Sequence, residues 1–164
     1  MALEIERVYL LSGPPPAMPA GEVWRIEQGY LQPDPAAPLS EGRLRRTVHA
    51  DGRVQHFHTV KRGVGRVREE VETEITREAF EAAWPRTQGR RLAKRRTRVR
   101  HGDLVWEVDE FDAPRVVLAE CELPHADAVA PPPHWLVPVL VREVTDEPEY
   151  RNFELARRAS LGMG

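Results

Sequence analysis

The sequence predicts a mainly β protein of the α+β class, built on eight antiparallel strands. Apolar side chains recur at every second position through most of the chain, which is the period of a strand, and turn residues separate the segments. Tight turns that join antiparallel neighbours are expected at 50–52 and 101–103, each containing Asp and Gly. The 164 residues, 41% of them apolar, can form a sizeable core, so we treat residues 1–164 as a single domain.

The alternation defines each strand in turn. Proline-rich stretches at 14–16, 33–38 and 131–133 lie outside the alternating segments and are interpreted as loops. The predicted strands are 3–11, 22–32, 42–49, 54–62, 65–75, 91–101, 104–111 and 115–123.

A few helices are expected at the periphery of these strands. Thr76 can cap a short helix that carries Phe80 and Ala83 on one side and stops at Pro85. A C-terminal helix is expected over about 147–159.

Charged side chains occupy alternate positions in seven of the segments. Residues two apart on a strand share a face, so these charges gather on one side of each strand. An antiparallel sheet with one solvated face explains any single strand. Seven such strands, with both signs of charge, favour a sheet closed into a tunnel with a polar lumen. The lumen positions are Glu4, Glu6, Arg43, Arg45, Lys61, Arg68, Glu70, Glu72, Lys94, Arg96, Glu120 and Glu122.

The two signs of charge predict two kinds of ligand. Guanidinium groups bind phosphate oxygens through paired hydrogen bonds and ammonium groups add point charge, so the basic set suits a highly charged anion. Neighbouring carboxylates would repel that anion unless divalent cations were bound, and Mg²⁺ or Mn²⁺ prefers such oxygen ligands. Burying so many like charges without counter-ions would be strongly unfavourable.

Other residues are expected to have ordinary roles. Cys121 alternates with charged positions and is interpreted as a packed thiol, and a single cysteine is typical of a reducing, cytoplasmic compartment. His56 and His58 face away from the lumen and lack a third zinc ligand. A net charge of −2 argues against nucleic acid as a partner, and the arginine-rich stretch 86–101 lacks interleaved aromatic residues. No apolar run is long enough to span a membrane, so no membrane partner is expected.

Nine short motifs follow one another through nearly the whole chain. They are EIER at 4–7, EQGYL at 27–31, RLR at 43–45, TVK at 59–61, REEVETEI at 68–75, LAKRR at 92–96, WEVDEF at 106–111, LAECEL at 118–123 and EVTDEPEYRN at 143–152. In this order they resemble the CYTH superfamily, also called triphosphate tunnel metalloenzymes. The resemblance implies an eight-stranded antiparallel tunnel that binds a linear triphosphate and divalent metal and hydrolyses a phosphoanhydride bond. The length and the QGRR at 88–91 are most similar to the small bacterial inorganic triphosphatases.

The resemblance also implies a role for each lumen position. Metal would be held by Glu4, Glu6, Glu120 and Glu122, with Glu70 and Glu72 serving a second ion. Phosphate would be held by Arg43, Arg45, Lys61, Lys94 and Arg96, and the alternation of charges adds Arg68 to this basic set. The catalytic set would be Glu4, Glu6, Tyr30 and Glu70, and which carboxylate activates water is left open. Glu143 matches a carboxylate near the tunnel mouth.

One position departs from the family's ExExK signature. Lysine is expected at position 8, where this chain has Val8, and this predicts weakened turnover of inorganic tripolyphosphate or a small organic triphosphate. A noncatalytic polyphosphate- or nucleotide-binding module is therefore an alternative. A class IV adenylyl cyclase is less favoured, because cyclases of this family typically carry a His-Phe pair ahead of the signature, whereas Met-Ala-Leu precedes Glu4 here. The preferred substrate and metal stay open, as does the oligomeric state, for which a homodimer is the candidate assembly.

Overall fold

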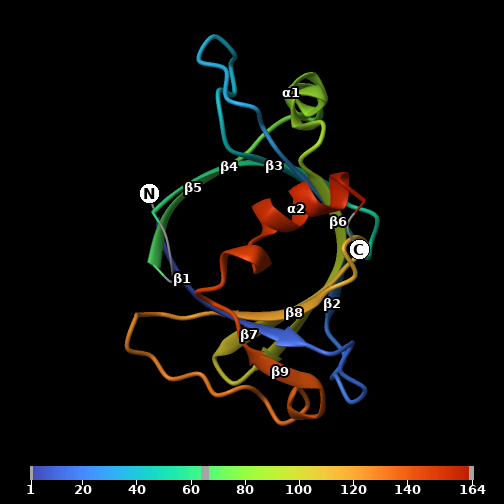
Figure 1. The fold of residues 1–164 in the computed structure, drawn as a ribbon, viewed down its shortest axis with the longest axis vertical. Coiled ribbons are helices and arrows are strands. Elements are labelled where there is room, and N and C mark those ends of the chain that lie inside the picture. The colour runs from blue at the N-terminus through green and yellow to red at the C-terminus, as the bar shows by residue number, and fades with distance from the viewer. Residues whose placement is uncertain (1, 64–66, 163–164) are drawn as a thin grey trace.

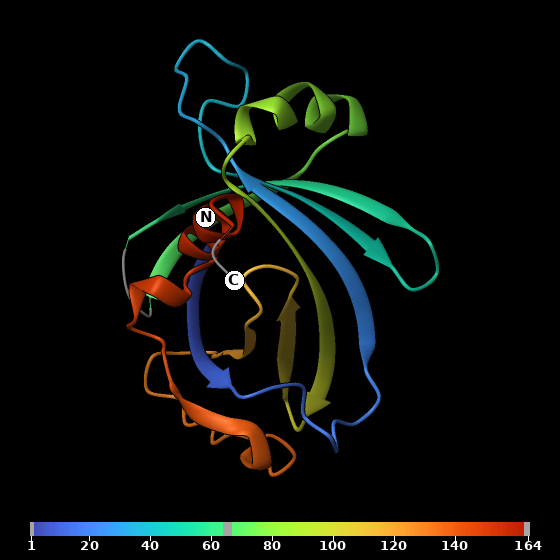
Figure 2. The ribbon, with the colours of Figure 1, turned by 45° about the vertical axis from the view of Figure 1, so that its right-hand side comes forward.

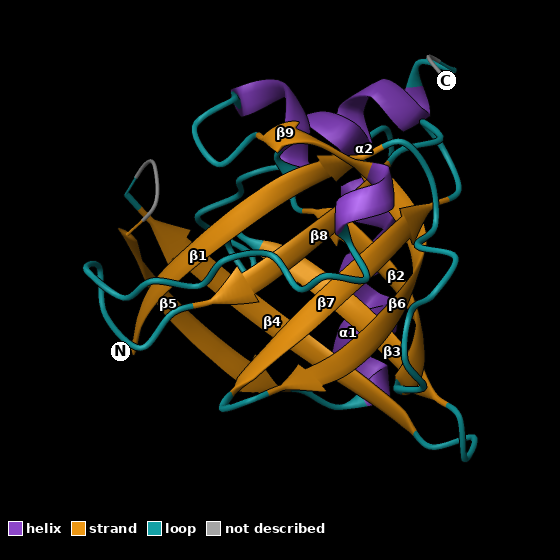
Figure 3. Cartoon of the chain, turned by 90° about the horizontal axis from the view of Figure 1, so that it is seen from below, coloured by secondary structure: helices purple, strands orange, loops and turns teal. Residues whose placement is uncertain are grey.

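Eight antiparallel strands close into a barrel in the computed structural model, which describes residues 2–63 and 67–162 (Figures 1 and 3). Along the barrel the order is β5-β4-β3-β2-β6-β7-β8-β1, and β1 pairs with β5 to complete the circle. The strands are β1 (Ala2–Leu11), β2 (Glu22–Tyr30), β3 (Arg43–His49), β4 (Val54–Arg62), β5 (Val67–Glu74), β6 (Arg91–His101), β7 (Leu104–Phe111) and β8 (Val117–Glu122). The predicted tunnel is confirmed, although residues 65 and 66 of the fifth predicted strand lie outside the described residues.

Both predicted turns join neighbouring strands. Gly52 lies between β3 and β4 with φ 87°, and Gly102 lies between β6 and β7 with φ 62°. These are left-handed conformations that glycine adopts without strain, which fixes the register of both hairpins.

A ninth strand, β9 (Leu140–Glu143), was not expected from the sequence. The first residues of β1 pair with β5, and Tyr9 to Leu11 pair with β9. The second half of β1 pairs with β8 on one side. On its other side β5 no longer pairs with it, and β9 pairs there instead. Four residues with no alternation of burial give little signal in a sequence.

The largest apolar core lies outside the barrel. Trp106 and Val108 point outward from β7, are fully buried, and share this core with Trp135 and Leu136 of the segment that follows β8. That segment is largely irregular and contains a 3₁₀ turn, Val137–Val139 (Figure 1). Prolines 131–133 remove backbone donors that a helix needs, so a loop covers this face of the barrel, as the sequence predicts for these prolines.

Helix α1 (Arg77–Ala83) packs on the outer surface, as predicted (Figure 2). Thr76 caps it by accepting a hydrogen bond from the backbone N–H of Ala79 at 3.1 Å. Phe80 is buried against Leu31 and Leu44, and the chain continues as a 3₁₀ turn, Trp84–Thr87.

Helix α2 (Asn152–Ser160) lies across the opening of the barrel, inside the ring of strands in Figure 1. Its buried residues Leu155 and Ala156 pack against apolar side chains that close one end of the lumen, among them Phe111 and Leu118. The helix begins later than predicted, because a 3₁₀ turn (Pro148–Tyr150) and an extended Arg151 precede it. Across residues 2–63 and 67–162, no helix has the length and apolar character needed to cross a membrane.

Candidate active site

A cavity of about 440 Å³ runs through the barrel, and all of the predicted site residues line it. From β1 to β3 these are Glu4, Glu6, Tyr30, Arg43 and Arg45; from β4 and β5, Lys61, Arg68, Glu70 and Glu72; and from β6 and β8, Lys94, Arg96, Glu120 and Glu122. The two-residue period explains this placement, since Ile5 and Tyr9, which alternate with the lumen residues, belong to the outer core.

The most buried charges form a cluster around Asp109. Lys94 Nζ donates to Asp109 Oδ2 at 2.7 Å, and Arg96 Nε donates to Asp109 Oδ1 at 2.7 Å. Lys94 and Asp109 are 0% and 1% exposed. Burial alone would raise the pKa of Asp109, but Arg96 and Lys94 hold that pKa well below its usual range. This carboxylate therefore keeps two cations oriented toward the cavity.

A second set of ion pairs crosses the junction between β1 and β5. Lys61 Nζ lies 2.8 Å from Glu4 Oε2 and 3.5 Å from Glu70 Oε2. Arg68 Nη2 lies 2.7 Å from Glu6 Oε1. Predicted phosphate-binding and metal-binding groups thus lie close enough to neutralise one another.

The remaining lumen cations differ in their partners. Arg96 also reaches Glu120, at 2.9 Å, and Arg43 lies 3.4 Å from Glu72. Arg45 donates only to the neutral side chain of Gln28, at 3.1 and 3.2 Å, and has no carboxylate within ion-pair distance among the described residues. Burial and the nearby guanidinium groups lower the pKa of Arg45 to about 9. Its unbalanced positive charge favours an anion in the lumen.

The carboxylates show the opposite imbalance. Burial and the charge of Glu6 raise the pKa of Glu120 to about 8. Burial and Glu4 raise the pKa of Glu70, and burial followed by Glu4 raises that of Glu122. Glu4 differs, because burial, which would raise its pKa, is outweighed by the combined effect of Lys61, Glu70 and Arg68, and the pKa of Glu4 is lowered. Repulsion among oxygen donors of this kind is relieved by a divalent cation.

Sequence reasoning did not assign a role to several residues at the site. Asn152 Oδ1, at the start of α2, accepts hydrogen bonds from Lys94 Nζ at 2.9 Å and Gln28 Nε2 at 3.1 Å. Arg151 lines the same cavity. The alternation within β2 and β7 places Gln28 and Asp109 on the lumen face, but nothing in the sequence shows that the C-terminal segment enters the barrel.

Glu143, expected near the tunnel mouth, lies between an outward-facing residue of β1 and Thr145, which lines the cavity and donates to its carboxylate at 3.2 Å. Its carboxylate accepts a hydrogen bond from Arg7 Nη1 at 3.1 Å, and Arg7 alternates with the lumen residues Glu6 and Val8. Glu143 therefore lies against the outer face of β1 and does not line the cavity.

The residues expected to have ordinary roles are found where predicted. Cys121 is buried in the outer core, and burial raises its pKa to about 11, which makes it a packed thiol and a poor nucleophile. His56 contacts Phe80 on the outer surface, and His58 Nε2 lies 2.7 Å from the backbone oxygen of Glu41. In the part of the chain that the structure covers, no three His, Cys, Asp or Glu side chains are grouped to hold a metal as they stand.

The closed barrel and its lumen of cations and carboxylates define a tunnel protein with a highly charged interior. The chain is 33% identical over 160 residues to the inorganic triphosphatase of Nitrosomonas europaea, covering 93% of this chain and 96% of that protein. It is 30% identical to the inorganic triphosphatase of Acetivibrio thermocellus, with 96% and 95% covered. The crystal structure of the inorganic triphosphatase NE1496 matches 96% of both chains, with a TM-score of 0.58 and 31% identity. No protein-family model matches. The chain belongs to the inorganic triphosphatase family of the CYTH superfamily.

Proposed function

We propose that this protein hydrolyses a linear triphosphate, either inorganic tripolyphosphate or a small organic triphosphate, in a metal-dependent reaction. The observation that carries the proposal is the cation–carboxylate lumen, in which Arg45 has only a neutral partner among the residues described. The names of the two relatives support the same reaction class. We assign the activity to residues 1–164 as one domain, and to the cytoplasm in keeping with the single cysteine.

The basic side chains would bind the phosphate groups. Lys94 and Arg96 are held by Asp109 and keep their orientation, so they meet the anion without rearranging. Arg43, Lys61 and Arg68 would exchange their carboxylate partners for phosphate oxygens.

The carboxylates suit Mg²⁺ or Mn²⁺ by their chemistry, as hard oxygen donors whose raised pKa values reflect mutual repulsion. A bound cation would neutralise charge on the phosphate oxygens. The residues proposed to hold it are Glu4, Glu6, Glu120 and Glu122, with Glu70 and Glu72 for a second ion.

Among the carboxylates, we propose Glu70 as the group that accepts a proton from the attacking water. Its pKa is raised by burial and Glu4, which brings it closer to neutral pH and makes it a better base than Glu4. Water would attack a terminal phosphorus, the bridging P–O bond would break, and phosphate and the shortened product would leave. Tyr30 accepts a hydrogen bond from Gln28 Nε2 at 3.2 Å, so its own hydroxyl proton can be donated to a phosphate oxygen.

Val8 is the observation that favours a second candidate, a noncatalytic polyphosphate-binding module. It lines the cavity and packs with the apolar residues at the α2 end of the lumen, so position 8 supplies no ammonium. Phosphate release from tripolyphosphate, thiamine triphosphate and ATP with Mg²⁺ or Mn²⁺ separates the two, with calorimetric binding measured in parallel. Release above a Glu70→Gln control supports the hydrolase, whereas binding without release supports the module.

A further inference from the structure

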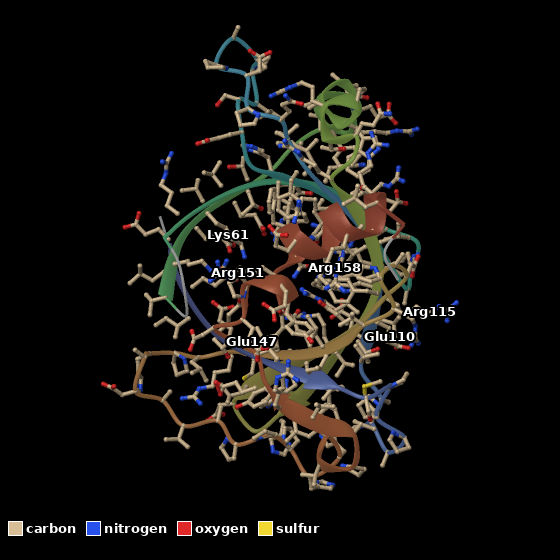
Figure 4. All side chains as sticks on the ribbon, viewed as in Figure 1. Lys61, Glu110, Arg115, Glu147, Arg151 and Arg158 are labelled. Carbon is tan, nitrogen blue, oxygen red and sulfur yellow. The ribbon has the colours of Figure 1, made fainter. Side chains whose placement is uncertain are left out.

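Arg151 enters the tunnel from the C-terminal segment. It lies between the 3₁₀ turn Pro148–Tyr150 and α2, and its side chain lines the cavity. Tyr150 packs against the apolar cluster at this end of the lumen, and Asn152 is bonded to Lys94. Figure 4 shows Arg151 inside the ring of strands, as is Lys61, while Arg115 lies outside. Both neighbours of Arg151 are thus anchored in the barrel, which fixes where its guanidinium can reach.

The charge of Arg151 is not balanced by a neighbour. Arg142 and Arg157, in the same part of the chain, form ion pairs with Glu147 at 2.8 Å and Glu154 at 3.0 Å. Arg151 has neither an ion pair nor a side-chain hydrogen bond to any described residue. Unlike Arg142 and Arg157, Arg151 lines the cavity and keeps its charge available for a ligand.

The wall beside this segment carries carboxylates and, over the described residues, no lumen cation. On β1 and β8 the residues lining the cavity are Glu4, Glu6, Val8, Leu118, Glu120 and Glu122. The segment that leads to Arg151 lies along Val8: Val8 N donates to Thr145 Oγ1 at 3.0 Å, and Val144 N donates to Val8 O at 2.8 Å. Positive charge for an anion at this end must therefore come from outside β1 and β8.

We propose that Arg151 is a substrate-binding residue, which holds a terminal phosphate group at the α2 end of the tunnel beside Val8. This rests on the proposed function, since it places one end of the same triphosphate. Arg151 would thereby supply from the C-terminal segment a positive charge that β1 does not carry. Its guanidinium can contact two phosphate oxygens at once.

The test is calorimetric binding of a methylene-bridged tripolyphosphate, which cannot be hydrolysed at the bridges, in the presence of Mg²⁺. Arg151→Gln should weaken binding by about tenfold or more, the loss of one charge-assisted hydrogen bond. Arg151→Lys keeps the charge and should retain most of the affinity. Arg115→Gln, a matched loss of charge on the exposed outer surface, should leave the affinity unchanged. Val8→Lys in the Arg151→Gln background should recover part of the lost affinity, because it restores positive charge at the same end.

The outcomes separate this inference from the proposed function. If the unaltered protein does not bind the analogue, the proposed function fails. If it binds and Arg151→Gln binds equally well, with circular dichroism showing both folded, the assignment of Arg151 is overturned. An equal loss in Arg115→Gln would show a general charge effect and would also overturn it. A double variant that binds no better than Arg151→Gln would overturn the placement beside Val8.

Discussion

Asp109→Asn should be among the most destabilising single substitutions in this protein. The carboxylate accepts hydrogen bonds from Lys94 Nζ at 2.7 Å, Arg96 Nε at 2.7 Å and Arg96 Nη2 at 2.8 Å, all within the barrel. The amide keeps the shape but loses the negative charge, and its NH₂ group faces donors. Buried Lys94 would then lack its counter-ion and Arg96 would keep only Glu107 and Glu120, and breaking a buried ion pair in this way costs about 3–5 kcal/mol.

The assay is reversible urea unfolding followed by circular dichroism, with thermal unfolding alongside. For a domain of this size, the loss corresponds to a lower Tm by about 6–20 °C. Asp103→Asn, in the exposed turn between β6 and β7, is the control and should change stability by less than about 0.5 kcal/mol. A loss below about 1 kcal/mol for Asp109→Asn would refute the reasoning, because it would mean that water or another anion satisfies both cations at little cost.

Three further predictions concern the lumen. Excess EDTA should abolish phosphate release from tripolyphosphate, and release at the full rate in chelator would contradict the assignment of carboxylates to metal. Glu120→Gln should flatten the pH dependence of stability. The folded protein holds a proton on Glu120 that the unfolded chain releases above its usual pKa of 4.5. The free energy of unfolding that depends on this proton is therefore lost as pH rises through about 8, where the pKa of Glu120 lies in the folded protein. Thermal unfolding at about pH 6 and about pH 9 tests this, and an unchanged slope would count against it. Val8→Lys should raise the turnover number for tripolyphosphate at least about tenfold, a conservative part of what one preorganised charge contributes; steady-state kinetics showing no increase would indicate specialisation for another substrate.

The lumen could be predicted from sequence because strand geometry has a period of two. Once Glu4 and Glu6 are placed on one face, Ile5 must lie on the other, and the same rule sorts Lys94 from Arg95 without knowledge of any contact. The rule needs only local information, and for this reason it held on all seven charged strands.

Contacts between distant segments could not be predicted in the same way. Asn152 is hydrogen-bonded to Lys94, which lies 58 positions away in the sequence. The residues that follow Asn152 show a helical pattern, which indicates only that one side of the helix is apolar. Which cation meets which carboxylate depends on strand order, and the pairing of β1 with β5 and β8 follows no local signal. The C-terminal segment was therefore expected outside the barrel, where most amphipathic helices pack, while its apolar side closes the lumen.

The ion pairs at the junction of β1 and β5 connect the closure of the barrel to its ligands. Lys61 and Arg68, from β4 and β5, hold Glu4 and Glu6 of β1 across the place where the sheet closes. A metal that drew Glu4 and Glu6 away would leave these cations unpaired in a partly buried site, which is unfavourable. A phosphate that drew the cations away would leave the carboxylates exposed to one another in the same manner. Binding of either ligand would thus leave unpaired charges that the other ligand neutralises. Because such coupling is reciprocal, metal should raise the affinity of the protein for triphosphate, and triphosphate should raise its affinity for metal.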